Sequence, residues 1–179
     1  MFKFIKLYYM FLNVSLLYII SKTSKNSIIF NMPKIGKGFS LSIFNRAKLN
    51  ISNLVARNNL SLFVSQGQLT FKKGCFVNNN CSFNCLDSIQ IGENTIFGEG
   101  VKVYDHDHII DNEYYVSKNE FITSAVKIGS NCWIGTNTII LKGVSITDNV
   151  IIGANSLVNK SISEPGVYVS KNGVLTKIK

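Results

Sequence analysis

The sequence has only two histidines, two prolines and one tryptophan among its 179 residues. Two histidines in one short run argue against a zinc centre that takes three imidazole ligands. The four cysteines form no Cys-x-x-Cys pair and are too few for a disulfide-stapled secreted domain. Disulfides and zinc stay open as alternatives, although buried reduced thiols in a reducing compartment explain the pattern best.

No apolar run is long enough to cross a membrane. The N-terminal run from Leu7 to Ile20 covers fourteen residues and is interrupted by Asn13 and Ser15, whereas a spanning helix needs about 20. A signal peptide is a further alternative, although no small-x-small cleavage site follows this run. Because residues 1–25 also carry four lysines, they predict a helix that lies either on the protein's own body or on an anionic membrane surface. Both alternatives stay open.

Acidic residues are absent from the first half of the chain. Residues 1–86 hold eleven Lys or Arg and no Asp or Glu, whereas residues 87–179 hold eight basic and ten acidic residues. This asymmetry favours an anionic partner for the first half, such as a lipid, a glycan or a nucleic acid. Regular arginine or aromatic stacking motifs are missing there, so we expect no nucleic-acid partner.

What the sequence does contain is a repeat of six residues in its last third. Cut at every sixth position, it reads IGSNCW, IGTNTI, ILKGVS, ITDNVI, IGANSL and VNKSIS. The same phase returns upstream in IGENTI, FGEGVK and VYDHDH. The first position is aliphatic or aromatic, the fifth is mostly small or β-branched, and Gly and Asn recur at the second and fourth.

A period of six suits neither an α-helix nor a flat strand, but it suits a short strand and a turn repeated around a three-faced prism. Three hexads close a coil of eighteen residues, so Ile128 is expected to stack on Ile146, and Ile134 on Ile152, about 4.8 Å apart. The glycines and asparagines are expected to relieve strained backbone at the corners. Upstream the phase degenerates, and we expect irregular first coils over residues 35–68.

The repeat breaks between residues 104 and 125, and such a long loop in a compact solenoid indicates function. Both histidines, His106 and His108, lie at its root. Asp105 or Asp107 could bond one ring nitrogen and fix the tautomer, which would leave the other nitrogen to accept a proton. Two alternatives stay open from spacing alone: solvated loop histidines, and a metal site, although no third soft ligand is visible nearby.

These hexads resemble those of the hexapeptide-repeat acyltransferases, and residues 75–170 are most similar to the branch that O-acetylates sugars and polysaccharides. The resemblance implies a left-handed parallel β-helix, a homotrimer with active sites between subunits, and acetyl-CoA as co-substrate without a metal. It implies that His106 deprotonates the acceptor hydroxyl for direct attack in a ternary complex, with His108 as second choice. It also implies that Asn84, in SFN, contacts the acceptor or the oxyanion.

The resemblance further assigns donor contacts along the last coils. These residues are Trp133, Gly135, Thr136, Ala154, Lys160 and Lys171. Glycine and alanine there also suit a corner without any ligand, and Lys160 also suits solvent. Trp133 is outward by the phase of the repeat, and an exposed tryptophan often marks a contact. The family's Gly-x-Pro-Ala stretch is missing, and Lys171 and Lys177 are the alternatives for contact to the adenosine end.

The sequence therefore predicts an N-terminal segment 1–25, a β-helix domain 26–170 with its loop 104–125, and a basic tail 171–179. We expect a cytoplasmic O-acetyltransferase, with possible contact to the inner membrane face, acting on a capsule, lipopolysaccharide or sialic-acid glycan. The rival functions are a xenobiotic acetyltransferase, a metal-binding solenoid like a γ-carbonic anhydrase, and a structural solenoid. An ice-binding surface would need flat ranks of threonine, and none is present.

Overall fold

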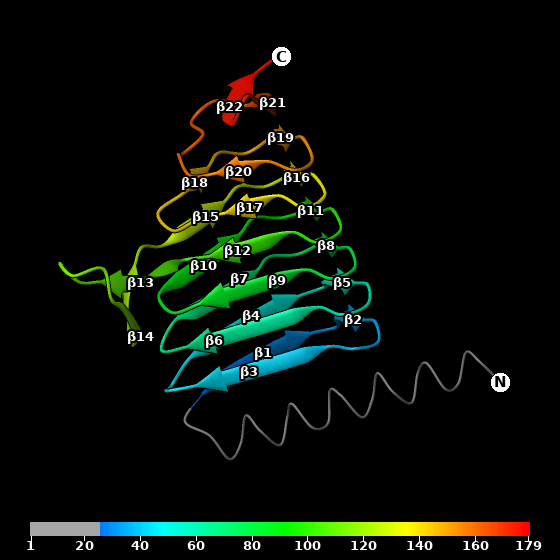
Figure 1. Cartoon of the computed structure of the whole chain (residues 1–179). Coiled ribbons are helices and arrows are strands. Elements are labelled where there is room, and N and C mark those ends of the chain that lie inside the picture. Colours follow the sequence, from blue (N-terminus) through cyan, green and yellow to red (C-terminus); the bar gives the residue numbers. More distant parts are fainter. Residues whose placement is uncertain (1–25) are drawn as a thin grey trace.

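The computed structural model describes residues 26–179 and shows a triangular prism of stacked coils, with three parallel sheets as its faces (Figure 1). Each coil contributes one strand to each face, in the order A, B, C. Face A consists of β1 (Ser27–Asn31), β4 (Lys48–Ser52), β7 (Gln68–Phe71), β10 (Ser88–Ile91), β15 (Val126–Ile128) and β18 (Ser145–Ile146). The predicted helix over residues 1–25 lies outside the described residues.

The other two faces follow the same stacking. Face B consists of β2 (Lys34–Ile35), β5 (Val55–Ala56), β8 (Phe76–Val77), β11 (Ile96–Phe97), β16 (Trp133–Ile134), β19 (Val150–Ile152), β21 (Gly166–Lys171) and β22 (Val174–Lys177). Face C consists of β3 (Ser40–Phe44), β6 (Ser61–Ser65), β9 (Ser82–Cys85), β12 (Lys102–Tyr104), β17 (Ile139–Ile140) and β20 (Leu157–Val158). The structure is thus a mainly β, parallel solenoid of six full coils.

The predicted stacking of hexads is confirmed. Ile128 pairs with Ile146 and Ile134 pairs with Ile152, in both cases eighteen residues later. All four side chains are buried in the prism. The first-position residues of the repeat therefore form the interior columns that hold successive coils together.

The early coils are longer, which explains why the repeat fades there. Lys34 pairs with Val55 twenty-one residues later, and Gln68 pairs with Ser88 twenty residues later. The extra residues lie at corners, for example Gln66, which adopts φ +63°. The stretch 35–68 therefore forms full coils with three strands each. Face C narrows along the prism, because β3 has five residues and β20 has two.

Asparagine and glycine serve different purposes at the corners. The fourth-position asparagines Asn94, Asn131 and Asn137 adopt the predicted left-handed conformation, with φ of 55°, 55° and 57°. The second-position glycines do not have positive φ, which corrects the prediction. A Cβ added at Gly135 would instead lie 2.5 Å from the Ala154 nitrogen of the next coil. Close approach between coils, and not backbone strain, requires glycine there.

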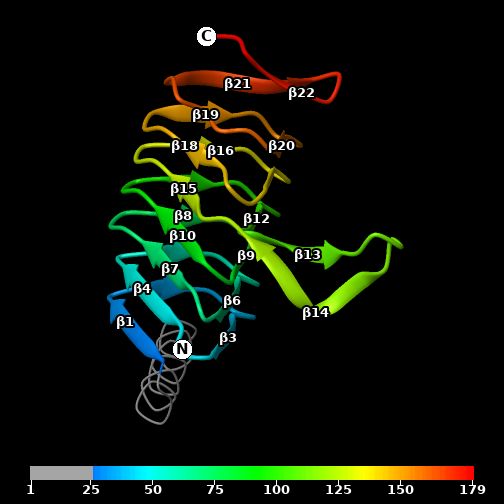
Figure 2. The same cartoon turned by 90° about the vertical axis from the view of Figure 1, so that its left-hand side faces the viewer.

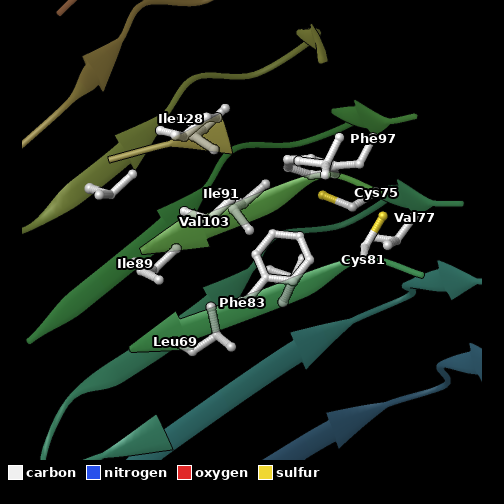
Figure 3. Close-up of a cluster of buried hydrophobic side chains, with 14 of the residues drawn as sticks. Leu69, Cys75, Val77, Cys81, Phe83, Ile89, Ile91, Phe97, Val103 and Ile128 are labelled. Atoms are coloured by element: carbon white, nitrogen blue, oxygen red, sulfur yellow. The ribbon is translucent and has the colours of Figure 1, made fainter. Parts of the chain in front are cut away.

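The interior is filled by aromatic and aliphatic side chains (Figure 3). The rings of Phe71, Phe83 and Phe97 pack edge to face, with centroids 4.9 and 5.2 Å apart. The thiols of Cys75 and Cys81 lie among them and donate to the carbonyls of Gly92 and Gly98 at 3.1 Å. All four cysteines are free and buried, as the sequence predicts.

The predicted loop 104–125 protrudes as a β-hairpin (Figure 2). Its strands are β13 (His106–Ile110) and β14 (Val116–Thr123), which pair antiparallel. Across this insertion Ile91 pairs with Ile128 thirty-seven residues later, yet both strands stay in register on face A. The hairpin is therefore added at a corner of the coil without disturbing the coils on either side.

The chain ends in a second hairpin. Residues 171–179, expected as a basic tail, include β22, which pairs antiparallel with β21. Asn172 and Gly173, with φ of 49° and 77°, form the turn, and this residue pair is favoured in tight hairpins. No helix in the part of the chain described by the structure has the length and apolar character needed to cross a membrane.

Candidate active site

His106 lies where the chain leaves face C and would turn toward face A, which we call the C–A corner. Side chains alternate along this segment, so Val103 points into the prism, Tyr104 outward, Asp105 inward and His106 outward. The backbone N–H of Ser124 donates to the Asp105 carbonyl at 2.8 Å and closes the base of the hairpin. The imidazole is therefore attached where a rigid coil meets the hairpin.

Asp105 is fully buried and holds the imidazole in one orientation. Its Oδ1 lies 2.9 Å from His106 Nδ1. The same carboxylate accepts the backbone N–H of Leu86 at 2.9 and 3.1 Å and that of Asp87 at 2.8 Å. Because a carboxylate only accepts, Nδ1 is the donor of this pair, and Nε2 carries the free lone pair. Of the two predicted carboxylates, Asp105 is the one that bonds an imidazole.

Two aromatic side chains form walls around His106, and sequence reasoning identified neither. The Phe121 ring packs perpendicular to the imidazole with centroids 5.3 Å apart, and the Tyr104 ring lies 6.3 Å away. The His106 side chain is 14% exposed. The alternation of β14 opposite β13 is the signal that could have indicated Phe121. The base is thus partly desolvated but still open to a substrate.

His108 and Asp107 bond to groups other than the Asp105–His106 pair, although the His108 ring packs on the same Phe121 ring as His106, with centroids 4.7 Å apart. The Nδ1 of exposed His108 lies 2.8 Å from the Ser117 carbonyl, across the hairpin. The Asp107 carboxylate pairs with Lys142 Nζ at 3.1 Å, and both groups are partly exposed. The structure therefore separates the two histidines into one held by a buried carboxylate and one that closes the hairpin.

Asn84 lies one coil below the site. It pairs in register with Tyr104 on the outer side of face C, two residues from His106. The side-chain Nδ2 of Asn84 donates to Ser82 Oγ at 3.5 Å, and the backbone carbonyl of Asn84 accepts the Asp105 N–H at 3.4 Å. The predicted residue is thus beside the site, with its amide on the outer surface.

The residues predicted for the donor lie at three places on the prism. Trp133, 52% exposed, lies on face B, and Thr136 and Ala154 are exposed one above the other at the B–C corner. Lys160 follows β20 at the C–A corner, and Lys171 ends β21 on face B. The hairpin and face B lie on opposite sides of the prism (Figure 1). One chain therefore does not bring His106 and Trp133 together.

No thiol is prepared for catalysis. Burial raises the pKa of Cys75 to about 11, and burial together with the nearby Asp105 raises the pKa of Cys85 further. Buried thiols with raised pKa are poor nucleophiles. Within residues 26–179, no three side chains of His, Cys, Asp or Glu are placed to share a metal ion.

Comparison with known proteins identifies the repeat. Residues 125–160 match the family described as "Bacterial transferase hexapeptide (six repeats)", which confirms the predicted hexapeptide repeat. No protein of curated function matches the sequence.

Solved structures share the fold. The polysialic acid O-acetyltransferase OatWY is 24% identical, covers 86% of this chain and 85% of its own, and superimposes with a TM-score of 0.62. The N-acyltransferase AntD from Bacillus cereus, in complex with dTDP and 3-hydroxybutyryl-CoA, is 22% identical, with 84% and 82% coverage and a TM-score of 0.64. A variant of AntD with dTDP and coenzyme A is 21% identical, with 90% and 88% coverage and a TM-score of 0.65.

Proposed function

We propose that this solenoid of hexapeptide repeats transfers an acetyl group from acetyl-CoA to a hydroxyl of a cell-surface glycan, with His106 as general base. The observation that carries the proposal is the buried Asp105 carboxylate, which fixes His106 Nδ1 at 2.9 Å. Structures of the same fold include an enzyme that O-acetylates polysialic acid and one bound to coenzyme A. Both similarities support acyl transfer, and the histidine geometry favours a hydroxyl that needs a base.

The reaction follows from this geometry. Nε2 of His106 accepts the proton of the acceptor hydroxyl as the oxygen bonds to the thioester carbonyl carbon. The carbon–sulfur bond of the tetrahedral intermediate then breaks, and the imidazolium returns its proton to the departing sulfur. The products are the sugar ester and free coenzyme A. Asn84, one coil below, is proposed to orient the acceptor or donate to the oxyanion.

A second copy of the chain completes each site in this proposal. A donor lying along Trp133, Thr136 and Ala154 would occupy the B–C corner, whereas His106 belongs to the C–A corner. We therefore place the donor between two prisms, as expected for a homotrimer in which each subunit presents two different surfaces. Lys160 and Lys171 are proposed for the donor phosphates and the adenosine end. The left-handed winding implied by the resemblance belongs to this proposal.

The acceptor is proposed to be anionic. Residues 26–86 contain no acidic side chain, so the first three coils have a purely basic charge. A capsule, lipopolysaccharide or sialic-acid glycan carries the matching negative charge. Membrane contact through residues 1–25 stays a prediction, as does the cytoplasmic location.

Thiol release from acetyl-CoA tests the function. The wild-type chain is expected to release thiol with at least one glycan of a panel of capsular, lipopolysaccharide and sialic-acid acceptors. His106→Ala should lower kcat by about 10²- to 10⁴-fold. Amino sugars belong in the panel, because preferred turnover of an amine would make the activity N-acyl transfer.

The matched control is His108→Ala, which removes the other imidazole outside the Asp105 pair. Its turnover is expected to stay within severalfold of wild type. Full turnover by His106→Ala, or loss of turnover only in His108→Ala, would contradict the assigned base.

A further inference from the structure

The outer surface of face C below His106 differs from the other two faces. Serines Ser40, Ser42, Ser61 and Ser82 alternate there with inward residues and leave their hydroxyls on the surface. Phe44, Phe63 and Asn84 lie on the same outer surface, next to these serines. The six strands of this face contain a single charged residue, Lys102. This composition of hydroxyls, an amide and aromatic rings belongs to neither an apolar interface nor an ordinary charged surface.

The aromatic residues form a strip that ends at His106. Tyr104, Asn84 and Phe63 occupy successive positions of one outward column, paired in register from coil to coil. Phe44, 51% exposed, continues the strip, since its ring lies 6.1 Å from that of Phe63. From Tyr104 to Phe44 there are three coil steps, or about 15 Å at the usual strand spacing. The strip is therefore several sugar rings long.

Aromatic rings and hydroxyls together fit a carbohydrate. The C–H face of a pyranose ring packs on an aromatic side chain, and its hydroxyls bond to serine and amide groups at the edge. Basic groups mark both ends of the strip: Lys102 beside Tyr104, and Arg46 at the corner that follows Phe44. No acidic residue occurs in residues 26–86. These charges favour an acidic glycan over a neutral one.

Resting on the function proposed above, we propose that face C from His106 to Phe44 is an extended subsite that binds an acidic oligosaccharide of several sugars. The sugar that reacts sits at His106, and the following sugars run down face C over Tyr104 and Phe63. The enzyme then acts on a chain already polymerised, and the class of reaction that supplies its substrate is glycosidic-bond formation.

The test is the dependence of kcat/KM on acceptor length. Sialic-acid oligomers and maltose-series oligomers of one to six sugars are the probes, with the full chain and acetyl-CoA. Wild type is expected to favour long acidic acceptors. Phe63→Ala and Phe44→Ala should each lower the ratio of kcat/KM for the longest over the shortest acceptor by about tenfold. Phe44 is half exposed, so its variant keeps the test valid if Phe63→Ala unfolds.

Charge is tested in parallel. Arg46→Gln is expected to lower the preference for acidic over neutral oligomers several-fold. The matched controls are Gln68→Ala on face A and Lys73→Gln at the corner between faces A and B, which should change neither ratio.

Each outcome decides one proposal. Turnover that is independent of length, or length ratios unchanged in both phenylalanine variants, overturns the extended subsite while the acetyl transfer stands. A preference for neutral oligomers overturns the acidic glycan. No thiol release with any acceptor overturns the proposed function instead.

Discussion

Asp105 is the residue on which the proposed chemistry depends. Its carboxylate accepts from His106 and from the backbone of Leu86 and Asp87. In Asp105→Asn the side-chain NH₂ group would face one of these N–H groups and leave that group without an acceptor. The loss in free energy of unfolding is about 1–3 kcal/mol. We expect a lower melting temperature and a kcat reduced at least as far as in His106→Ala.

Comparison of Asp105→Asn with His106→Ala separates the effect of Asp105 on the orientation of the imidazole from its effect on the stability of the fold. His106→Ala should lose turnover with a smaller fall in melting temperature than Asp105→Asn, because the Asp105 carboxylate keeps its bonds from the Leu86 and Asp87 N–H groups. An Asp105→Asn chain that keeps wild-type kcat would show that the imidazole needs no carboxylate.

The buried thiols predict a loss of stability at high pH. Burial raises the Cys75 pKa from 9.0 to about 11. Between these two values the folded chain holds more protons than the unfolded chain, so stability is present below pH 9 and falls as the pH rises. The Cys75 contribution to this fall is about 2 kcal/mol. Urea unfolding of wild type and Cys75→Ala at pH 8 and 11 should show a smaller decrease in the variant.

The sequence predicted the pairing of a carboxylate with His106 but not which carboxylate. In an alternating strand, neighbours Asp105 and Asp107 point to the same side, so local spacing does not distinguish them. The choice is made by the coil below, whose Leu86 and Asp87 N–H groups reach Asp105 alone. Phe121 was not predicted, because it meets His106 only through the fold of the hairpin.

The hairpin is an insertion that should be removable. Regular coils repeat every eighteen residues, and the coil with the hairpin takes thirty-seven. Deletion of residues 106–124 restores a coil of eighteen residues. Ala125 then directly follows Asp105, at the position that Gly143 takes in the next coil with φ +76°. With Ala125→Gly added, we expect a folded prism with far-ultraviolet circular dichroism like wild type and no turnover. Loss of the folded state would show that the hairpin stabilises the coils.

The corner glycines predict a contrast between two substitutions. A Cβ at Gly135 meets only backbone at 2.5–2.7 Å, whereas a Cβ at Gly153 meets first the Val169 side chain, at 3.1 Å. Gly135→Ala should therefore destabilise by about 1–3 kcal/mol, and Gly153→Ala by less, since a side chain can yield. Chemical denaturation measures both. Equal losses of stability in the two variants would show that backbone conformation, and not close approach between coils, requires glycine at these corners.

Face B carries an apolar column on its outer side through five successive coils, from β5 to β19. Val55, Phe76, Ile96, Trp133 and Ile151 pair in register and point outward. Large exposed apolar surfaces of this kind indicate association. Ile96→Glu, at a residue 44% exposed, should lower the mass in light scattering to that of a monomer and reduce thiol release. Gln90→Glu on face A is the matched control and should keep the wild-type mass.

At the scale of the molecule, the six-residue period was enough to predict the prism and its stacked isoleucines. It could not predict the longer first coils, because one additional corner residue shifts every later position out of phase. It also could not place Lys160 at a different corner from Thr136 and Ala154, since that depends on how the three faces close. The charge asymmetry was visible in the sequence, but the strip on face C appears only when strands twenty residues apart lie side by side.

The narrowing of face C has a consequence for self-assembly. A solenoid leaves hydrogen-bonding edges open at both ends, and copies of uniform width could join end to end into fibres. Here one terminal edge is the five-residue β3 and the other is the two-residue β20. A copy added lengthwise would leave most backbone groups of the wider edge without partners. The taper of face C thus works against amyloid-like pairing of copies through this face.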